Sequence, residues 1–559
     1  MEMKFGANHG ICKAMKALCF LAWLVLSHCI PVHGQGRVHR LSKAEYEDRV
    51  SGAWTGQIIA TLMAFPFEHK ASSAAWIDDY PKPYSAAPVD DDWYYEMVAL
   101  RAFEHYGTEL SLEQLAAHWK EHSVGTWGSS EQARLLLSQG VPASWVGHPR
   151  YNRLWFSIGP QFSCDMYGMI APGMPNLAAG IARRLSHING YAEGSDGGVF
   201  VAGMISLAFV EKDPRQIVRK AARLIHPSSP YRQCLDLVVS LAESGSTARE
   251  VFDAVEDRWH MEYPATNNAV ANGGLVAASV WFGEGDFMKS VNLAAGAADF
   301  SDADCNAANA GAVAGAMSGL KGIPMHLVAR LNDRIKGSQM GPLAVDPPVD
   351  ESLSAFCRRV SDLGLRILAR NGVQEKGGVL SLPETQIRTQ EAETFRLSEL
   401  TRYWNPDWTL ERAGFGGAGG GMRGIRGITY LEGDVLATYP RDEVRGTLLH
   451  RKMKLEGAQR LVLEVAADPK RHWELSVFAD NDRLHTEVVK GADSARVWKQ
   501  VQVDLSAFNG REVRLRLYQK VLLQGREAGN AYWRNLGIQS RAASTADSGV
   551  KGGVPNPER

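Results

Sequence analysis

Two clusters of carboxylates stand out in the sequence because each directly precedes a stretch with helical periodicity. Asp90-Asp91-Asp92 comes before residues 94–106, and Asp302 and Asp304 come before a helix expected to run through Leu320. The N-terminal end of a helix favours negative charge, so a solvated helix start would explain either cluster. Carboxylate oxygens are also the ligands that the hard cations Mg²⁺ and Mn²⁺ prefer.

The helix after the second cluster carries a stripe of small residues. Gly311, Gly315 and Gly319 recur every four residues, with alanines between them. Residues three or four apart share one helix face, so a second backbone can approach closely along this stripe. The pattern predicts a central helix that holds Asp302 and Asp304 inside a bundle. Buried carboxylates are costly without a cation and basic residues are few nearby, so the sequence favours Mg²⁺ or Mn²⁺ over zinc.

Four segments, in the right order, resemble the ADP-ribosylglycohydrolase family (dinitrogenase reductase-activating glycohydrolase-like). The last segment, with its acidic helix start and small residues, is the most specific match. The segments lie within residues 47–334 and are Gly52 to Gly56 with Pro66 to Glu68, Asp90 to Asp92, Gly159 to Gly168 with Ala171 to Gly173 and Ser186-His187, and Asp302 to Cys305 with Ala307-Ala308, Gly311, Gly315 and Ile323-Pro324.

The resemblance implies an all-α bundle that binds two Mg²⁺ ions, with Mn²⁺ as an alternative, between the two acidic motifs. Cys305 and Trp93 stand where the family motifs have threonine, and a thiol is a poorer Mg²⁺ ligand than a hydroxyl. The metal ligands implied by the resemblance are Asp90, Asp91, Asp92, Asp302, Asp304 and Cys305. The substrate contacts implied by its cleft segment are Gln161, Asp165, Gly168, His187 and Asn189.

The expected function is hydrolysis of an N- or O-glycosidic bond in an ADP-ribosyl or related ribosyl or glycosyl substrate. Such cleavage passes through an oxocarbenium-like transition state, and two carboxylates commonly share the work. Asp302 is the expected acid/base, with Glu68 assisting, while a dinuclear metal site orients sugar hydroxyls and activates a water. The alternative is a noncatalytic protein whose degenerate site keeps affinity for metal and carbohydrate. Retention of the carboxylates favours catalysis, and loss of the two threonines favours the alternative.

The elements that must position these residues belong to a large all-α domain, residues 35–372. Leu353, Phe356, Val360, Leu363 and Ile367 form an apolar helical stripe that Asn371-Gly372 closes. Further helices are expected at 177–185, 199–209 and 234–242, and a capped one from Ser111. Residues 373–404 are polar and mixed, which indicates a connector. The glycine-rich stretch 414–427 lacks the ending of a P-loop and indicates a flexible loop.

From residue 405 to 541 the apolar residues alternate, which predicts an antiparallel β-sandwich of the jelly-roll type. The alternation is clear at 461–465, 475–477, 501–505 and 513–517. The segment from Trp498 to Leu505 and Tyr532-Trp533 resemble galactose-binding-like domains of secreted glycosidases. Their aromatic rings could stack on a carbohydrate or could equally fill the sandwich core.

Composition and the chain ends limit the remaining possibilities. The 559 residues carry a net charge of −1, which argues against a nucleic-acid partner. The seven cysteines include no CxxC pair and support neither a zinc ribbon nor a disulfide scaffold. Residues 1–34 are typical of a signal peptide, which predicts a secreted or periplasmic protein with no membrane association after cleavage. Residues 542–559 are rich in Ser, Gly and Pro and are expected to be disordered.

Overall fold

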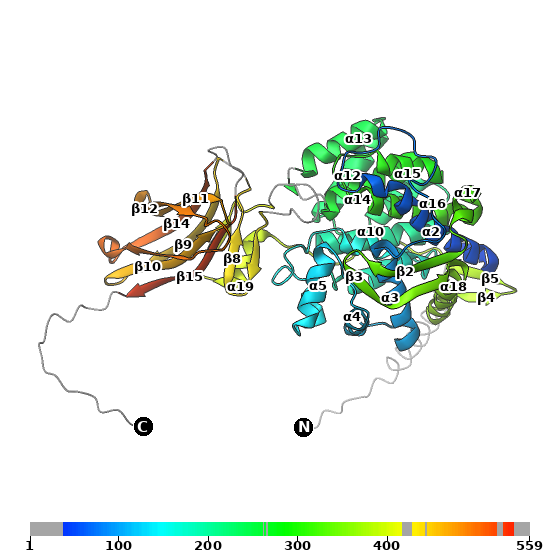
Figure 1. Ribbon diagram of the computed structural model, residues 1–559, viewed down its shortest axis with the longest axis horizontal. Helices are drawn as coiled ribbons and strands as arrows, with labels where there is room; N and C mark the ends of the chain where they lie inside the picture. The colour runs from blue at the N-terminus through cyan, green and yellow to red at the C-terminus, as the bar shows by residue number, and fades with distance from the viewer. Residues whose placement is uncertain are drawn as a thin grey trace, which may run out of the picture.

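The computed structural model describes residues 37–260, 262–263, 267–415, 427–441, 444–522 and 529–540. The expected signal peptide, the C-terminal tail and most of the glycine-rich loop lie outside the described residues. A helical domain and a β-sandwich stand side by side (Figure 1). Of the helices in the described ranges, none is both long and apolar enough to cross a lipid bilayer.

The first domain is built mainly of helices, as the sequence predicts. Capping boxes define the starts of α4, at Ser111, and of α13, at Thr247, because each cap side chain and its partner satisfy two free backbone N–H groups. The helices are α2 (Lys43–Ala64), α3 (Asp91–Tyr106), α4 (Leu112–Glu121), α5 (Gly128–Ser138), α6 (Ala143–Val146), α7 (Gly159–Phe162), α8 (Asp165–Met169), α9 (Pro175–Ser186), α10 (Glu193–Ala208), α11 (Pro214–Ala222), α12 (Pro230–Glu243), α13 (Ala248–Val255), α14 (Ala269–Gly283), α15 (Phe287–Ala295), α16 (Ala303–Ser318), α17 (Met325–Arg330), α18 (Leu353–Arg370) and α19 (Leu400–Trp404).

The small-residue stripe brings α16 against α2 in the middle of this domain (Figure 1). A Cβ atom at Gly315 would lie 2.1 Å from the carbonyl oxygen of Gly52, and one at Gly56 would lie 2.5 Å from that of Gly311. These distances are too short for any side chain, so the two backbones meet directly. The contact fixes the first turn of α16, where Asp302 and Asp304 lie.

Short strands also occur within the part of the chain expected to be all-α. β1 (Val38–Ser42) pairs antiparallel with β5 (Val379–Pro383), which also pairs with β4 (Gln374–Lys376). A hairpin joins β2 (Arg334–Met340) to β3 (Leu343–Ser352). The sequence did not indicate them because many of their residues are exposed and polar. Residues 374–383 therefore belong to the sheet that closes this domain, rather than to a free connector.

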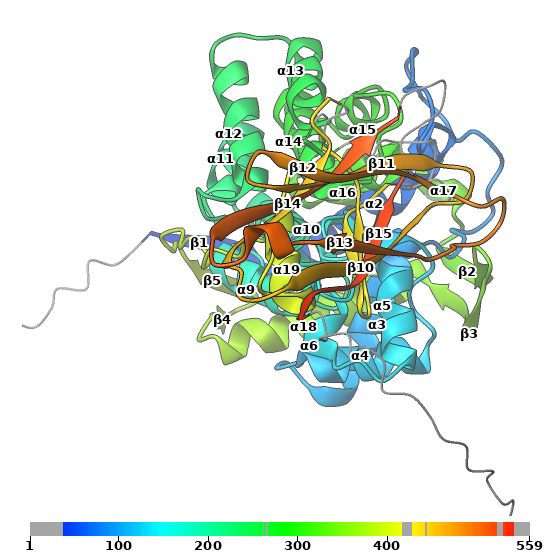
Figure 2. The ribbon, with the colours of Figure 1, turned by 90° about the vertical axis from the view of Figure 1, so that its left-hand side faces the viewer.

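The second domain packs two antiparallel five-stranded sheets face to face (Figure 2). One sheet has the order β13-β10-β15-β8-β7 and the other β12-β11-β14-β9-β6. Alternate residues such as Leu461, Leu463, Leu515 and Leu517 fill the space between them. The strands are β6 (Thr409–Glu411), β7 (Tyr430–Glu432), β8 (Val435–Thr438), β9 (Thr447–Lys454), β10 (Gln459–Ala467), β11 (His472–Ala479), β12 (Asp482–Lys490), β13 (Lys499–Asp504), β14 (Glu512–Val521) and β15 (Ala531–Ser540).

The aromatic residues singled out in the sandwich are not free stacking surfaces. Trp533 is 1% exposed and packs 5.0 Å from Trp473 between their ring centroids. The guanidinium of Arg496 lies 3.7 Å from the ring centroid of Tyr532, and that of Arg534 lies 4.0 Å from the nearer ring of Trp498. The core interpretation therefore holds for Trp533, whereas Trp498 is half-buried and Tyr532 lines a cavity of about 540 Å³.

Candidate functional site

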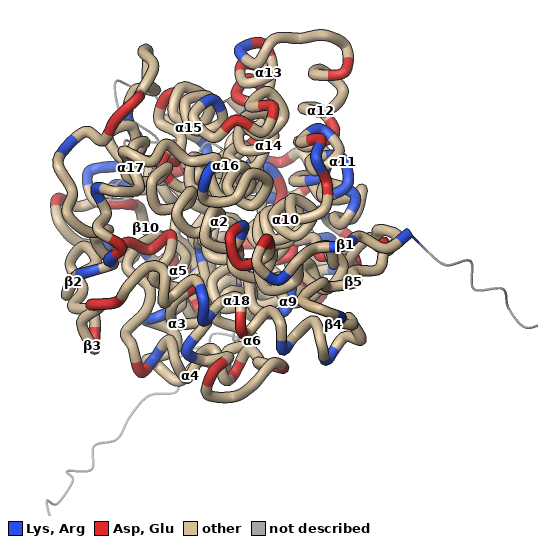
Figure 3. The backbone as a smooth tube through the Cα atoms, turned by 90° about the vertical axis from the view of Figure 1, so that its right-hand side faces the viewer, with Lys and Arg blue, Asp and Glu red and all other residues tan. Residues whose placement is uncertain are grey.

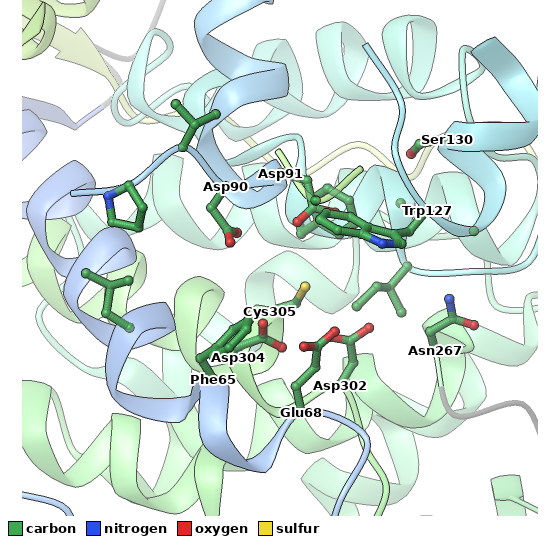
Figure 4. Close-up of a pocket in the computed structure, with 18 of the residues that line it drawn as sticks. Phe65, Glu68, Asp90, Asp91, Trp127, Ser130, Asn267, Asp302, Asp304 and Cys305 are labelled. Carbon is green, nitrogen blue, oxygen red and sulfur yellow. The ribbon is translucent and has the colours of Figure 1, made fainter. Parts of the chain in front are cut away.

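A cavity of about 370 Å³ in the helical domain, called the acidic cavity below, collects most of the predicted metal ligands (Figure 4). Both acidic motifs and Glu68 contribute to its wall. The residues that line it are Leu62, Phe65, Glu68, Lys82, Tyr84, Pro88, Val89, Asp90, Asp91, Trp127, Gly128, Ser129, Ser130, Ser157, Ile158, Gly159, Phe162, Asn267, Asp302, Asp304, Cys305 and Gly341.

The carboxylates approach the cavity from opposite sides. Asp90 and Asp91, at the start of α3, face Asp302 and Asp304, at the start of α16 (Figure 4). Asp90 caps α3 by accepting a 3.3 Å hydrogen bond from the backbone N–H of Asp92. Asp302 occupies the equivalent position of α16 but makes no capping hydrogen bond, so its carboxylate remains available to the cavity. Glu68 follows a short 3-10 turn, Phe65–Phe67, at the end of α2.

The carboxylates repel one another in a buried setting. Burial, reinforced by Asp302, raises the pKa of Glu68 to about 7, and burial raises the pKa of Asp90 to about 6. Burial and the neighbouring acids raise the pKa values of Asp91, Asp92 and Asp304 well above the ordinary range. Isolated buried anions are unfavourable, so this arrangement needs protons or a cation.

Several carboxylate oxygens lack any hydrogen-bond partner, which fits a site for a hard cation. Asp92, Asp302 and Asp304 each have one buried Oδ1 without a partner among the described residues. Ligand atoms of Asp92, Asp304 and Cys305 lie within 4.8 Å of one another. Oxygen-rich donor sets of this kind suit Mg²⁺ or Mn²⁺.

Asp92 and Cys305 occupy the inner end of the site. The hydroxyl of Thr61 donates to Asp92 Oδ2 at 3.1 Å, and the Cys305 thiol also hydrogen-bonds this carboxylate. Burial and the surrounding aspartates raise the pKa of the Cys305 thiol, so it stays protonated. Trp93, the other departure from the family motif, is fully buried, and its indole N–H donates to the carbonyl of Pro88. The inner end of the site therefore contains one soft ligand atom, the sulfur of Cys305, beside the carboxylate of Asp92.

His69 is a candidate functional residue that sequence reasoning missed. Its Nε2 lies 3.8 Å from Glu68 Oε1 and 3.8 Å from Asp302 Oδ2, and neither ring nitrogen has a hydrogen-bond partner among the described residues. Its backbone has a positive φ of 51°, which is uncommon outside glycine. In the sequence, its position directly after Glu68 was the feature that could have indicated a role for His69.

The five predicted substrate-binding residues lie elsewhere, since the described residues that line the acidic cavity include none of them. His187 is held 2.7 Å from Glu393, a contact that fastens the segment after β5 to the helical domain. Gly168 lies against the backbone of Ala202, where a Cβ atom would come within 2.5 Å of the carbonyl oxygen.

The other three are buried behind the cavity wall. Gln161 accepts a hydrogen bond from the hydroxyl of Tyr231 at 2.9 Å. Asp165 accepts one from the side chain of Asn309 at 2.9 Å. Asn189 donates at 3.0 Å to the hydroxyl of Ser130, which does line the cavity. Gln161 Nε2, Asp165 Oδ1 and Asn189 Oδ1 have no hydrogen-bond partner among the described residues, and a substrate contact of these residues stays a prediction.

Other side chains complete the lining of the cavity. Trp127, Ser130 and Asn267 lie to one side of the labelled acids (Figure 4). The helix α5 starts at Gly128, which lines the cavity, and no side chain caps it. These residues were not predictable from the sequence because they come from separate segments that carry no common motif.

Comparisons with known proteins place the chain in a family. The ADP-ribosylglycohydrolase family model matches residues 42–356. Among solved structures, an ADP-ribosylglycohydrolase-related protein complex covers 58% of this chain and 99% of its own, with 14% identity and a TM-score of 0.39.

Two further solved structures resemble part of the chain. The K3 adhesin domain of Lys-gingipain from Porphyromonas gingivalis (13% identity, 24% of this chain and 92% of that chain, TM-score 0.17) is one. The other is a structure described as CBM4, which is 11% identical, covers 24% of this chain and 89% of its own, and has a TM-score of 0.18. No curated protein matches the chain. Because the family model spans more than half of the 559 residues, the chain belongs to the ADP-ribosylglycohydrolase family.

Proposed function

We propose that the protein is a metal-dependent glycohydrolase that cleaves an N- or O-glycosidic bond of an ADP-ribosyl or related ribosyl or glycosyl substrate. The observation that carries the proposal is the convergence of Glu68, Asp90, Asp91, Asp302 and Asp304 on one cavity. Buried carboxylates without partners are unfavourable for stability, so their grouping supports a role in binding a cation and a substrate.

Two Mg²⁺ ions, or Mn²⁺ in their place, would be held by the two acidic motifs. The residues that would hold them are Asp90, Asp91, Asp92, Asp302 and Asp304, with Cys305 at the edge of the set. When bound, such ions supply Lewis acidity and orient sugar hydroxyls and water.

Asp302 and Glu68 are suited to divide the proton transfers. The Glu68 side chain is 34% exposed at the cavity, so it can exchange protons with solvent, whereas that of Asp302 is 8% exposed. Asp302 is the acid/base group in this proposal, and Glu68 assists by relaying a proton. The His69 ring lies 3.8 Å from both carboxylates, where a protonated imidazole would offset part of their negative charge.

Part of the cavity wall is suited to an anionic substrate with an aromatic base. The start of α5, at Gly128, lines the cavity without a side-chain cap, and the N-terminal end of a helix favours phosphate oxygens. Lys82, whose Nζ lies 5.4 Å from the ring centroid of Tyr84, adds positive charge, and Trp127 offers a ring for stacking. These features support an ADP-ribosyl group over an uncharged glycoside.

A substrate panel tests the proposal. The purified protein would be incubated with ADP-ribosyl-arginine, ADP-ribosyl-serine and uncharged glycosides, each with Mg²⁺ and with a chelator. We expect chelator-sensitive release of free ADP-ribose from one of the ADP-ribosyl substrates. Release that is unaffected by the chelator, or release from none of the substrates despite bound metal, would contradict this function.

The second candidate is a noncatalytic protein that binds metal and carbohydrate. The observation that favours it is the protonated thiol of Cys305, which takes the place of a hydroxyl beside Asp92. Binding of ADP-ribose without turnover, in metal-loaded protein, would support it. In either case we propose a secreted or periplasmic location, based on residues 1–34, and a carbohydrate ligand for the sandwich.

A further inference from the structure

A second group of metal-ligating side chains lies on helix α4, outside the acidic cavity. His118, Glu121 and His122 each offer a ligand atom, and these atoms lie within 4.8 Å of one another. The lining of the acidic cavity includes none of the three among the described residues. Their order, His-x-x-Glu-His, places two histidines four residues apart, which brings them to one side of the helix end. Histidine pairs at this spacing recur in helical zinc sites.

His118 has the properties of a ligand that lacks its ion. It is 8% exposed, and no hydrogen-bond partner for its Nδ1 exists among the described residues. The nearest carboxylate oxygen, Glu121 Oε2, is 4.0 Å from this nitrogen, beyond hydrogen-bonding distance.

His122 is oriented by a contact typical of metal ligands. Its Nδ1 lies 2.9 Å from the backbone carbonyl oxygen of Asp346, in β3. A carbonyl oxygen only accepts hydrogen bonds, so Nδ1 carries the proton and Nε2 keeps its lone pair. Metal-binding histidines usually donate their other N–H to a carbonyl or carboxylate, which fixes the tautomer and the ring.

We propose that His118, Glu121 and His122 bind a transition-metal ion of the Zn²⁺ class. His105, in the last turn of α3, lies beside this cluster, with its ring centroid 5.6 Å from that of His118. Two or three imidazoles with one carboxylate suit zinc, whereas Mg²⁺ prefers an all-oxygen set. The positive charge of Arg101 also acts on this cluster and repels a bound cation. The affinity for the ion must therefore come from its bonds to the histidine nitrogens.

The site would brace one wall of the acidic cavity. The contact between His122 and Asp346 ties the end of α4 to the hairpin of β2 and β3. At the tip of this hairpin, Gly341 lies against the ring of Trp127, where a Cβ atom would come within 2.4 Å of the indole. Both Gly341 and Trp127 line the cavity, so an ion at the α4 end stabilises this wall without taking part in the chemistry.

Metal titration with a spectroscopic probe tests the proposal. Metal-stripped full-length protein would be titrated with Co²⁺ in excess Mg²⁺, which keeps the acidic cavity filled, and then with Zn²⁺ in competition. We expect the protein to bind one equivalent of Co²⁺, and the bound ion to show the intense visible absorption of a nitrogen-ligated, low-coordinate site. Zn²⁺ should displace this Co²⁺ and remove the absorption. His118→Gln and His122→Gln should each weaken binding at least tenfold, whereas the exposed His326→Gln should leave it unchanged.

Two results would overturn the proposal: no such Co²⁺ spectrum in the wild-type protein, or equal affinity in the two histidine variants and His326→Gln. Thermal unfolding followed by circular dichroism checks that the variants fold. If the histidine variants do not fold, Glu121→Gln decides, because that side chain is 68% exposed and its replacement leaves the core intact. Weakened binding in Glu121→Gln supports the site, and unchanged binding contradicts it.

Discussion

Cys305 is the residue that most distinguishes the metal side of this cavity. It is a buried, protonated thiol beside Asp92, at a position where a hydroxyl would offer a harder ligand. The preference between Mg²⁺ and softer ions should therefore depend on this one side chain.

We expect Cys305→Thr to improve Mg²⁺ binding, because it exchanges a poor ligand atom for an oxygen of similar size. The concentration of Mg²⁺ that gives half-maximal activity should fall roughly tenfold, in the range associated with single metal-site contacts. Cys357→Thr serves as the control, because Cys357 is an equally buried thiol that lies outside the cavity lining. An unchanged or higher Mg²⁺ requirement in Cys305→Thr would argue against the thiol as a determinant of metal preference.

Trp127 carries the expected stacking contact with the substrate. Replacing it with alanine should raise KM about 10- to 100-fold, since stacking of an aromatic ring on a base contributes ~1–3 kcal/mol. The turnover number should change little, because the indole of Trp127 has no group that can take part in the proton transfers. Steady-state kinetics with Trp145→Ala as the matched control would test this, and a loss confined to kcat would contradict it.

The acidic half of the site was predictable from sequence, whereas its polar half was not. Asp90 to Asp92 and Asp302 to Cys305 each form a local pattern at a helix start, and the structure brings both to one cavity. Ser130, Ser157 and Asn267 come from distant segments, and only tertiary packing brings them together. The resemblance implies Gln161 and His187 as substrate contacts; the described residues lining the cavity do not include them, and each makes a hydrogen bond elsewhere in the domain.

At the level of elements, the contact between α2 and α16 determines where the carboxylates lie. The glycine stripe was visible in the sequence because its spacing matches the helical period. The strands near the ends of the helical domain were not visible, since β1 and β5 are about 340 residues apart and only pairing defines them. The alternating pattern of the sandwich strands made that domain predictable.

Gly315→Ala should test this helix contact. The added Cβ atom would meet the backbone of Gly52 at 2.1 Å, and backbone cannot rotate away as a side chain can. We expect the free energy of unfolding to fall by about 1–3 kcal/mol, as for other overpacked cores. Metal affinity should fall as well, because the first turn of α16 shifts with the helix.

Gly180→Ala is the control for that substitution. Gly180 lies in α9, and an added Cβ atom would meet nothing within 4 Å. Alanine should stabilise this helix by about 0.5–1 kcal/mol. Urea unfolding of both variants gives the comparison, and equal effects at the two positions would mean that close backbone packing of α2 and α16 is unimportant.

At the scale of the whole molecule, the two domains meet through aromatic and charged contacts. Phe415 stacks on Tyr263 at 5.2 Å between ring centroids, and Arg441 donates to Glu262 at 2.5 Å. A cavity of about 430 Å³ lies at this interface, and Glu193 lines it. Figure 3 shows the molecule from the end of the helical domain that lies away from the sandwich. Acidic and basic residues are intermixed there, as expected for a chain with a net charge of −1.

Glu193 should make stability depend on pH. Burial raises the pKa of Glu193 to about 8, and its Oε2 has no partner among the described residues. The folded state therefore binds the proton more tightly than the unfolded state. The contribution of protonated Glu193 to the free energy of unfolding is complete below pH 4.5 and is lost as the pH rises through about 8. Glu193→Gln, which still accepts the hydrogen bond from Tyr263, should reduce the fall in Tm between pH 5 and pH 9.

The control for this measurement is Glu375→Gln, which changes an exposed glutamate of β4. Its Tm profile should follow that of the wild-type protein. A Glu193→Gln profile that also follows the wild type would mean that Glu193 is ionised in the folded protein throughout this pH range.

The most direct test of the central claim compares wild-type protein with Asp302→Asn in the release of free ADP-ribose at saturating Mg²⁺. Asp299→Asn is the matched control, since Asp299 lies three residues earlier, is exposed and hydrogen-bonds Ser72. We predict at least a hundredfold loss for Asp302→Asn, the low end of what general acid–base groups contribute, with folding intact and Asp299→Asn fully active. Wild-type rates in Asp302→Asn would contradict the assignment of the acidic cavity as the catalytic site.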